Sequence, residues 1–413
     1  MNYPDIQNLV SQYGSPFYLI ERGRFEDNFD ALVKAFGTRY MPLNLAYSYK
    51  TNYTPYLCRL FRDKGGWAEV VSRMEYDLAI KVGCDPAKII FNGPVKRSDD
   101  IAMALSNGSV VNLDSQPEID AVLAYAAAHP DKTVPIGLRV NIGLSDAAGR
   151  SHIQNSLKVG RFGFDPHEIE EAGRKLAAQK NIKVVSLHGH TSTTDRSVWC
   201  FKAITETLVQ IGRRFFADTI EYLNIGGGMF GVVPPEHRWC AMPSFDDYAE
   251  AVCGVLNADA WVQKRKPALV IEPGVAMVAN AVSFITQVVS VKTVQGKVFV
   301  TVDGSAFNTK PTFHAINPPF AVISETKTSA SPQTFDVVGS TCMEKDILLK
   351  DISAPLPKVG DFLRIDNVGA YTVVMTPPFI NPAPVIVAKE SDRIVCVRRR
   401  QTLEDVFAGY IFG

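Results

Sequence analysis

A lysine directly behind a strand-like segment is the residue from which chemistry could begin. Residues 43–50 read Leu-Asn-Leu-Ala-Tyr-Ser-Tyr-Lys, so large apolar side chains alternate with small or polar ones. Because neighbouring side chains of a strand point to opposite faces, this pattern suits a barrel strand with helices outside. Lys50 then lies at the barrel mouth, where a desolvated lysine can form a Schiff base with a carbonyl cofactor. A solvated surface lysine is the alternative, and the rest of the chain must decide.

The composition bounds the class of protein. The 413 residues are enough for two domains, and the 43 basic residues balance the 43 acidic ones, so neither nucleic acid nor a membrane surface is predicted as a partner. We expect no secretory leader and no membrane-spanning segment. The seven scattered cysteines contain no CxxC pair, which argues against disulfides and zinc and predicts a reducing, cytoplasmic location.

Strand-like and helix-like segments alternate from about residue 25 onward. Ser72-x-x-Glu75 and Ser115-x-x-Glu118 are interpreted as capping boxes that open two of the helices. Eight strands in such an alternation predict an α/β fold, a (β/α)₈ TIM barrel, with its chemistry at the carboxyl ends of the strands. The predicted strands are residues 43–49, 67–71, 88–92, 109–113, 134–140, 183–188, 220–225 and 267–271.

After about residue 278 the pattern changes to short runs rich in Val, Ile and Phe, separated by Gly, Pro and Asp. These runs predict a C-terminal antiparallel β domain, which the N-terminal strand Pro16–Ile20 is expected to complete. The expected domains are therefore a cofactor-binding barrel over residues 25–277 and a β domain made of residues 1–24 and 278–413.

Three groups at predicted strand ends could hold a flat, phosphorylated cofactor. Gly226-Gly227-Gly228 offers backbone N–H groups to a phosphate, although a tight turn would also need glycine. Glu272 could accept a hydrogen bond from a protonated ring nitrogen, or it could be an exposed acid in a turn. His188 and His190 could be zinc ligands, acid–base groups or a stacking platform. No third zinc ligand is evident, so we favour ring stacking for His190.

In their order along the chain, these motifs resemble those of the fold-type III pyridoxal-phosphate decarboxylases, the family of diaminopimelate and ornithine decarboxylases, whose barrel alanine racemase shares. Each motif is short, but seven of them occur in the same order from about residue 16 to residue 371. The matching segments are Tyr47–Asn52, Ser72–Glu75, His190–Thr193, Gly226–Gly228, Glu272–Gly274, Cys342–Asp346 and Gly369–Tyr371.

The resemblance implies pyridoxal 5'-phosphate as the cofactor and gives each motif a role. Lys50 corresponds to the Schiff-base lysine, His190 to the histidine stacked on the ring, and Glu272 to the acid that keeps the ring nitrogen protonated. The phosphate would be held by the glycine loop. The further cofactor-binding residues implied are Glu69, Arg139, Thr193, Gly226, Gly227, Gly228, Gly274 and Tyr371.

The resemblance also implies an obligate homodimer that decarboxylates an amino acid. Cys342 corresponds to a cysteine that reaches across the dimer interface and reprotonates the α-carbon after CO₂ leaves. Cys342 and Asp346 would then act in the neighbouring subunit's site.

Three positions depart from the family pattern. Val275 stands where an arginine commonly contacts the phosphate, so the phosphate anchor is an open question. Met343 follows the cysteine where an acid is common, with Glu344 one step later, and Lys310-Pro311 replaces a common Arg-Pro. Lys310, with His314 nearby in sequence, could suit a substrate that bears a carboxylate at its far end. The expected substrate-binding residues are Lys310, His314, Met343, Glu344 and Asp346.

Two other functions are compatible with the same barrel. An amino-acid racemase would share the fold and the cofactor, but the cysteine motif favours decarboxylation. A catalytically inactive regulatory homologue would explain Val275 and Met343, but the presence of Lys50, Glu272 and Cys342 together argues against it.

Overall fold

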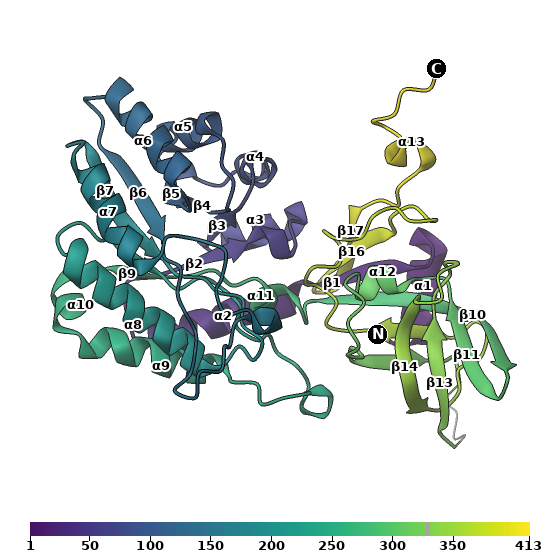
Figure 1. The fold of residues 1–413 in the computed structure, drawn as a ribbon. Coiled ribbons are helices and arrows are strands. Elements are labelled where there is room, and N and C mark those ends of the chain that lie inside the picture. Colours follow the sequence, from purple (N-terminus) through teal and green to yellow (C-terminus); the bar gives the residue numbers. More distant parts are fainter. Residues whose placement is uncertain (327–330) are drawn as a thin grey trace. The chain divides into compact units, whose positions relative to one another are not determined.

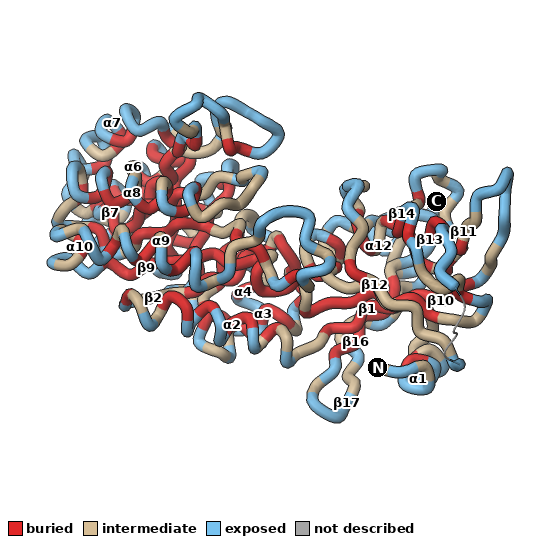
Figure 2. Tube along the Cα trace, turned by 90° about the horizontal axis from the view of Figure 1, so that it is seen from below, coloured by how far each residue is buried: buried red, intermediate tan, exposed pale blue. Residues whose placement is uncertain are grey.

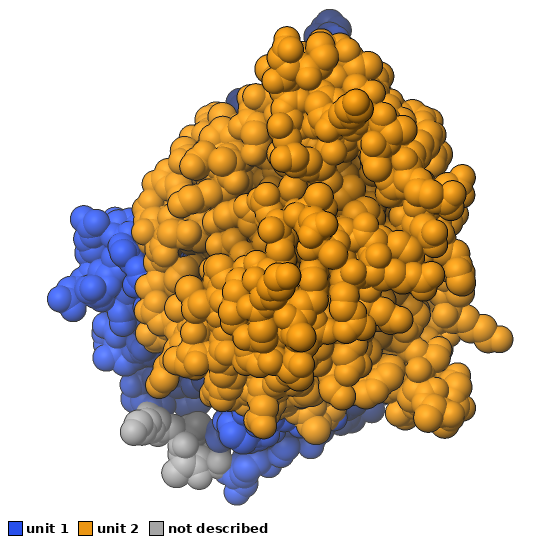
Figure 3. All heavy atoms as spheres, turned by 90° about the vertical axis from the view of Figure 1, so that its left-hand side faces the viewer, with its two compact units in different colours: residues 1–26, 231–239, 278–413 blue, residues 27–230, 240–277 orange. Residues whose placement is uncertain are grey.

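The computed structural model describes residues 1–326 and 331–413, which divide into two compact units (Figure 3). Unit 1 consists of residues 1–26, 231–239 and 278–413, and unit 2 of residues 27–230 and 240–277. The segment 231–239 lies inside the sequence range expected for the barrel but groups with unit 1. Each unit is described by itself.

Unit 2 contains a closed barrel of eight parallel strands, as predicted (Figure 1). The barrel closes because the first strand pairs with the last, with Leu43 opposite Leu269. The barrel strands are β2 (Leu43–Ser48), β3 (Trp67–Val70), β4 (Ile89–Phe91), β5 (Val110–Leu113), β6 (Val134–Arg139), β7 (Ile182–His188), β8 (Tyr222–Asn224) and β9 (Ala268–Ile271).

Helices separate the barrel strands, and several begin at residues that favour a helix start. Pro55 and Pro166 occupy first-turn positions, where the missing N–H costs no helical hydrogen bond. The short α10 was not predicted; it begins where Asp259 accepts from two backbone N–H groups. The helices are α2 (Arg22–Gly37), α3 (Pro55–Asp63), α4 (Arg73–Lys81), α5 (Ser98–Ser106), α6 (Gln116–Ala128), α7 (Pro166–Ala177), α8 (Val198–Phe215), α9 (Phe245–Ala258), α10 (Ala260–Arg265) and α11 (Val275–Val278).

The two predicted capping boxes do not form. Ser72 does accept from the backbone N–H of Glu75, but the Glu75 carboxylate reaches past it to the N–H of Val71 at 2.8 Å. Ser115 makes no side-chain cap, and the Glu118 carboxylate accepts instead from the N–H groups of Lys96 and Asp114. Both glutamates are buried, so they bond to the ends of nearby barrel strands rather than to their own helix.

The barrel interior is layered. Four buried apolar residues, Ala46, Ile90, Val110 and Val270, form a cluster with Trp67 and Tyr222 packed against it. Two positions further along each of these six strands lies a buried polar residue, and the barrel strands are correspondingly red in Figure 2. These six residues are Ser48, Glu69, Asn92, Asn112, Asn224 and Glu272. A two-residue step keeps the same face of a strand, so all six point into the barrel at its carboxyl end.

Unit 1 is built on a nine-stranded sheet in the described residues. The N-terminal strand completes this sheet, as predicted, by pairing with β10 and β16. The sheet is mixed rather than purely antiparallel, because β1 runs parallel to β16 and β11 runs parallel to β13. Its strands are β1 (Phe17–Glu21), β10 (Val282–Val294), β11 (Lys297–Val302), β12 (Phe320–Ile323), β13 (Gln333–Val338), β14 (Ile347–Ala354), β15 (Phe362–Ile365), β16 (Val385–Glu390) and β17 (Arg393–Arg398).

Three short helices accompany the sheet: α1 (Tyr3–Tyr13), α12 (Ala306–Thr309) and α13 (Leu403–Val406). Helix α1 was not predicted, although Asn2 and Asp5 form a capping box at its start. Its residues Ile6 and Leu9 pack on Phe17 and Leu19 of β1. Among the described residues, no helix is both long enough and apolar enough to cross a membrane.

The buried Glu75 gives a test of pH-dependent stability. Burial raises the pKa of the Glu75 carboxyl from 4.5 to about 7, with the Val71 N–H opposing and the Glu69 charge adding to the rise. Between these two pH values the unfolded chain ionises while the folded chain keeps its proton, so stability falls as the pH rises. Glu75→Gln removes this loss, so we expect the variant to be more stable than the parent above pH 7 by up to about 3 kcal/mol, and nearly equal to it near pH 4.5.

Urea unfolding at pH 5 and pH 8 measures the effect, with the exposed Glu170→Gln on α7 as the matched control. A gain of the same size at both pH values, or no gain at pH 8, would contradict the burial of an acid with a raised pKa.

Candidate active site

Lys50 lies just past the end of β2, in a single 3₁₀ turn over Tyr49–Thr51. Its Nζ is 2.5 Å from Oε2 of Glu69, and one third of the lysine side chain is exposed. Glu69 is the second-last residue of β3. It is almost fully buried and also accepts a hydrogen bond from the Ser48 hydroxyl at 2.6 Å. A buried carboxylate therefore orients the lysine and can exchange a proton with it over a short distance.

Glu272 follows β9 and is the second buried acid of the barrel mouth. Its Oε1 accepts from Asn92 and from Asn224, each at 2.7 Å, and its Oε2 is 3.3 Å from Nε2 of His188. Burial by itself would raise the pKa of the Glu272 carboxyl, but the charge and contact of His188, followed by Lys50 and His190, hold that pKa below its usual range. Glu272 is therefore an ionised acceptor.

His190 follows β7 and lies against the glycine loop. The N–H of Gly227 donates to its Nδ1 at 3.3 Å, so the ring proton belongs on Nε2. Burial, with the nearby charges of Arg139 and Lys50, lowers the pKa of His190 to about 3. The ring is therefore neutral at physiological pH, as a flat stacking surface for a cationic ring requires.

The glycine loop after β8 is shaped by close backbone approaches. Gly226 and Gly228 have φ of 68° and 110°, which only glycine adopts readily. A Cβ on Gly226 would lie 2.5 Å from Cβ of His190, and one on Gly227 would lie 2.1 Å from the Glu272 carbonyl oxygen. The neighbouring Gly274 has the same constraint, since its Cβ would lie 2.1 Å from Oγ1 of Thr51. A side chain at Gly226, Gly227 or Gly274 would therefore collide with the residues that form the barrel mouth.

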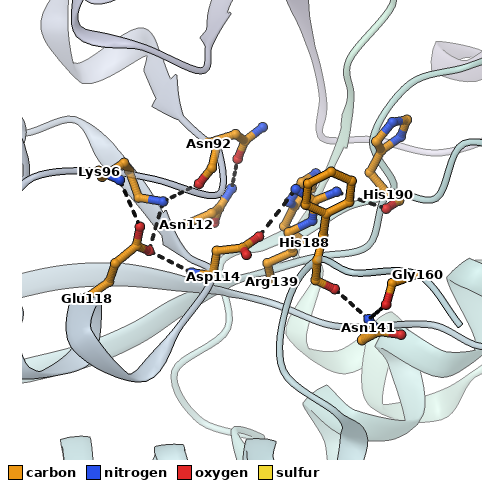
Figure 4. A network of polar contacts seen from close by, with 12 residues as sticks. Asn92, Lys96, Asn112, Asp114, Glu118, Arg139, Asn141, Gly160, His188 and His190 are labelled. Atoms are coloured by element: carbon orange, nitrogen blue, oxygen red, sulfur yellow. Dashed lines mark hydrogen bonds and ion pairs between the residues drawn. The ribbon is translucent and has the colours of Figure 1, made fainter.

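Arg139 ends β6 and connects the site to a charged network (Figure 4). It lies 3.4 Å from Oδ1 of Asp114, donates to the carbonyl of His190 at 3.1 Å, and stacks over the ring of Phe162. Burial lowers the pKa of Arg139, but the Asp114, Glu272 and Glu69 charges oppose this. Arg139 thus holds the backbone of His190 in place.

The other end of this network is a fully buried ion pair. The Lys96 Nζ lies 2.9 Å from Oε2 of Glu118 and donates to the Gly93 carbonyl at 2.7 Å. The same Glu118 oxygen accepts from the N–H of Asp114 at 2.8 Å, as Figure 4 shows. Two cations, Lys96 and Arg139, therefore lie at the ends of a series with two anions, Glu118 and Asp114, between them, which keeps the buried charge balanced.

Thr193 lies in the loop after His190. Its hydroxyl accepts from the N–H of Arg196 at 3.2 Å, and its backbone forms a bridge with Ile153. The loop is held further by His152, whose Nδ1 is 2.8 Å from the Asp195 carboxylate.

The remaining predicted site residues belong to unit 1. Cys342 is exposed in the turn before β14. Asp346 is buried, and its carboxylate accepts from the Thr341 hydroxyl and N–H, the Ser305 hydroxyl and the Ala306 N–H at 2.6–3.0 Å. Within its own chain Asp346 therefore fixes the turn that carries Cys342.

The expected substrate-binding residues of unit 1 differ in exposure. Lys310 caps α12 and is buried, which lowers the pKa of its ammonium group; burial and Lys310 likewise lower the pKa of His314. Met343 is half-buried and Glu344 exposed. Tyr371 is partly exposed and has a φ of 58°.

Sequence reasoning missed the amides that hold the two acids. His188 was considered only as an alternative zinc ligand, acid–base group or stacking platform, and Ser48, Asn92, Asn112 and Asn224 were given no role in the site. The signal that could have found them is parity: each lies an even number of residues from an inward-facing apolar residue of its own strand.

The residues of the barrel mouth fit pyridoxal 5'-phosphate. The amine of Lys50 can react with an aldehyde, ionised Glu272 can pair with a ring N–H, and three successive glycines leave the loop after β8 without side chains, so that an anion can approach its backbone closely. A closed parallel barrel with these groups at its carboxyl end defines the class of barrel-type pyridoxal-phosphate enzymes.

Comparisons with known proteins give the family. The family model described as pyridoxal-dependent decarboxylase, pyridoxal binding domain, matches residues 22–279. A probable chloroplastic diaminopimelate decarboxylase of Oryza sativa subsp. japonica is 30% identical, covering 95% of this chain and 78% of its own. The diaminopimelate decarboxylase of Methanothermobacter thermautotrophicus is 27% identical, covering 98% and 94%.

The solved structures agree. The crystal structure of diaminopimelate decarboxylase from Helicobacter pylori, complexed with L-lysine, has a TM-score of 0.85 at 26% identity and covers 98% of each chain. The chain belongs to the pyridoxal-dependent decarboxylases. It is a pyridoxal-phosphate-dependent amino-acid decarboxylase, which confirms the predicted class of enzyme and cofactor.

Proposed function

We propose that this decarboxylase acts on an amino acid with a carboxylate at its far end, and that diaminopimelate is the first substrate to test. The supporting observation is Lys310, a buried cation that makes no ion pair with any acid in the described residues. A buried charge without a partner is costly, and a carboxylate of the substrate would supply one. The curated relatives reported above are named diaminopimelate decarboxylases.

At the reacting end, Lys50 and Glu69 handle a proton. When bound, pyridoxal phosphate supplies an aldehyde for amines and an electron-poor ring that accepts the electron pair released with CO₂. Lys50 must present a neutral amine, and Glu69 is placed at 2.5 Å to take its proton at Oε2. Ser48 and Asn92 hold this carboxylate at the distance the transfer needs.

Glu272 and His190 serve the ring. The ionised Oε atoms of Glu272 accept the ring N–H, and that charge-assisted hydrogen bond keeps the ring nitrogen protonated. The neutral ring of His190, held by Gly227 and by Arg139, offers a flat face and adds no positive charge beside a cation. Both side chains are fixed by the barrel, so they need little rearrangement during the reaction.

The phosphate is assigned to the glycine loop with Thr193 and Gly274. The lack of side chains on the glycines lets an anion approach the backbone closely, although the N–H groups of Gly226 and Gly227 already donate to Asn224 and His190, and the position of the usual arginine is Val275. Tyr371 is proposed as a further cofactor contact on the resemblance alone.

We further propose a homodimer in which Cys342 of one subunit protonates the α-carbon in the other. Exposure of Cys342 and the rigid Asp346-centred turn support this role, because a group that acts across an interface must be accessible and well placed. Residues 25–277 would hold the cofactor, and residues 1–24 with 278–413 would contribute to the shared site. Met343 and Glu344 directly follow Cys342 in the sequence, and His314 lies four residues after Lys310. These residues are proposed to line the part of the site that binds the substrate's far end. All seven cysteines are free, which fits the predicted cytoplasmic location.

Lys50→Ala tests the function directly. The parent protein supplied with pyridoxal phosphate should show a visible absorption band and release CO₂ from diaminopimelate, because the amine of Lys50 is available to the cofactor aldehyde. The variant should lack both, while Lys81→Ala, an exposed lysine on α4, should keep both. In deuterated water the product should carry deuterium at the α-carbon and lack one carboxylate. Deuterium exchange with the carboxylate retained would indicate a racemase, and a parent without a visible band would indicate an inactive homologue.

Lys310→Ala tests the substrate class. Removal of a buried cation that pairs with the distal carboxylate should raise KM for a dicarboxylic substrate about tenfold to a hundredfold, with a smaller change in kcat. Steady-state CO₂ release from diaminopimelate, ornithine and carboxylate-bearing conjugates measures this, with the exposed Lys350→Ala as control. An unchanged KM for every dicarboxylic substrate would remove Lys310 from the pocket.

Mixed dimers test the shared site. Lys50→Ala and Cys342→Ala subunits are each expected to be nearly inactive alone, because each lacks one group of every site. Mixing them should restore activity, since some dimers then contain one intact site. The measurement is CO₂ release after subunit exchange. Activity that stays at the level of the separate variants would place both groups in the same subunit's site.

A further inference from the structure

Asn92, the residue after β4, contacts both buried acids of the barrel mouth at once. Its Nδ2 donates to Oε1 of Glu69 at 3.0 Å and to Oε1 of Glu272 at 2.7 Å. An amide nitrogen has two hydrogens, so both are used. Glu69 is the partner of Lys50, and Glu272 is the acid assigned to the ring nitrogen. One side chain therefore joins the lysine end of the site to the ring end.

The orientation of this amide follows from its neighbours. The Oδ1 of Asn92 accepts from Nδ2 of Asn112 at 2.7 Å, as Figure 4 shows. A flipped amide would face two carboxylate oxygens with its own oxygen and face an NH₂ group with its own NH₂ group. All three contacts would then be repulsive, so the observed orientation is the one the network permits.

Asn112 is itself placed for this purpose. Its Oδ1 is buried and makes no hydrogen bond in the described residues, so the bond to Asn92 is the one side-chain bond that it forms there. Space for it comes from Gly137 on the adjacent β6, where a Cβ would lie 1.8 Å from that oxygen. A buried acceptor without a donor is unfavourable. The position of Asn112 therefore favours its hydrogen bond to Asn92 over a hydrogen bond to its own Oδ1.

We propose that Asn92 is a positioning residue that holds the carboxylates of Glu69 and Glu272 through one amide and couples the proton on Lys50 to the charge at the ring nitrogen. Two carboxylates that face one site repel each other, and normally one of them takes up a proton. A shared donor with both hydrogens engaged stabilises the two anions without adding charge. The acids can then perform different tasks a short distance apart.

A positioning role and a packing role for Asn92 predict different effects of substitution. Packing requires a side chain of the right volume, and Asp has nearly the same volume and shape as Asn. Positioning requires two N–H donors, which an aspartate lacks. Asn92→Asp therefore separates the two roles, and Asn224→Asp is the matched variant, because Asn224 donates to Glu272 and is not bonded to Glu69.

The inference rests on the assignment of Lys50 and Glu272 to the cofactor, so the first measurement avoids the cofactor. The free energy of unfolding of the apoprotein is measured by urea from about pH 2 to pH 8 for the parent, Asn92→Ala and Asn8→Ala, the last an exposed site on α1. In the parent, the low pKa of Glu272 adds stability that is present above the unfolded pKa and is lost as the pH falls. Without Asn92 that pKa is depressed less, so the stability lost by Asn92→Ala should grow with pH across the acid range, between the Glu272 pKa of the parent and that of the variant, and should stay level above it. A loss that is the same at every pH would reduce Asn92 to packing and overturn the proposal.

The second measurement uses the cofactor. The dissociation constant for pyridoxal phosphate and the pH midpoint of its visible absorption are measured for Asn92→Asp, Asn224→Asp, Asn112→Ala and Asn8→Asp. We expect Asn92→Asp to weaken binding about tenfold or more and to raise the midpoint by about one pH unit, because a third anion favours protonation around Lys50. Asn112→Ala should shift both in the same direction by less, and Asn8→Asp should shift neither.

The comparison of the two asparagines decides the coupling. Asn224→Asp should weaken binding but move the midpoint less than Asn92→Asp does. An equal midpoint shift in both variants, or none in Asn92→Asp, would overturn the link through Glu69. If the parent itself gives no visible band, the cofactor assignment fails instead, and the pH dependence of the apoprotein still tests whether Asn92 supports the two acids.

Discussion

Two negative charges inside an apolar barrel are the constraint on which this structure depends. Glu69 and Glu272 are almost completely buried, and each needs hydrogen-bond donors and positive partners to remain ionised. Lys50 supplies a positive partner, His188 lies 3.3 Å from Glu272, and Ser48, Asn92 and Asn224 supply the neutral donors. The amides also bring the backbone into position, since Asn224 accepts from the N–H of Gly226 at the start of the glycine loop. The cofactor site is therefore an outcome of charge stabilisation in the barrel interior.

Much of this arrangement could be predicted from the chain itself. The alternation of eight strand and helix segments predicted the barrel, because the periodicity of each segment is local. The positions of Lys50, Glu272 and the glycines followed from the rule that the carboxyl ends of parallel strands share one edge. The mixed character of the unit 1 sheet did not follow, since the parallel pairing of β1 with β16 joins residues more than 360 positions apart.

The partners of the glutamates were the least predictable feature. Ser72 with Glu75 and Ser115 with Glu118 have the spacing of a capping box, but both acids face buried backbone N–H groups of other elements. The spacing of two residues along a helix shows only which local hydrogen bond is possible. The strength of a hydrogen bond to a carboxylate also depends on the surrounding dielectric. Unpaired N–H groups at the ends of buried strands have no access to water, so they bind these acids more strongly than a solvated helix start does. The series Lys96–Glu118–Asp114–Arg139 arises in the same way and has no sequence signature of its own.

The two-residue offset between the apolar cluster and the polar layer limits how this enzyme can evolve. Loss or gain of one residue inside β2, β3, β4, β5, β8 or β9 would turn the polar group of that strand outward to the covering helices and bring an apolar side chain inward. Such length changes remove a polar group from the barrel interior and place it among hydrocarbon at the same time, so a compensating substitution at a single position does not repair them. Length variation among homologues should therefore be confined to the connecting loops, while the identity of residues within the strands remains free to change at the outward-facing positions. The barrel therefore restricts the lengths of these six strands more strictly than it restricts their sequences.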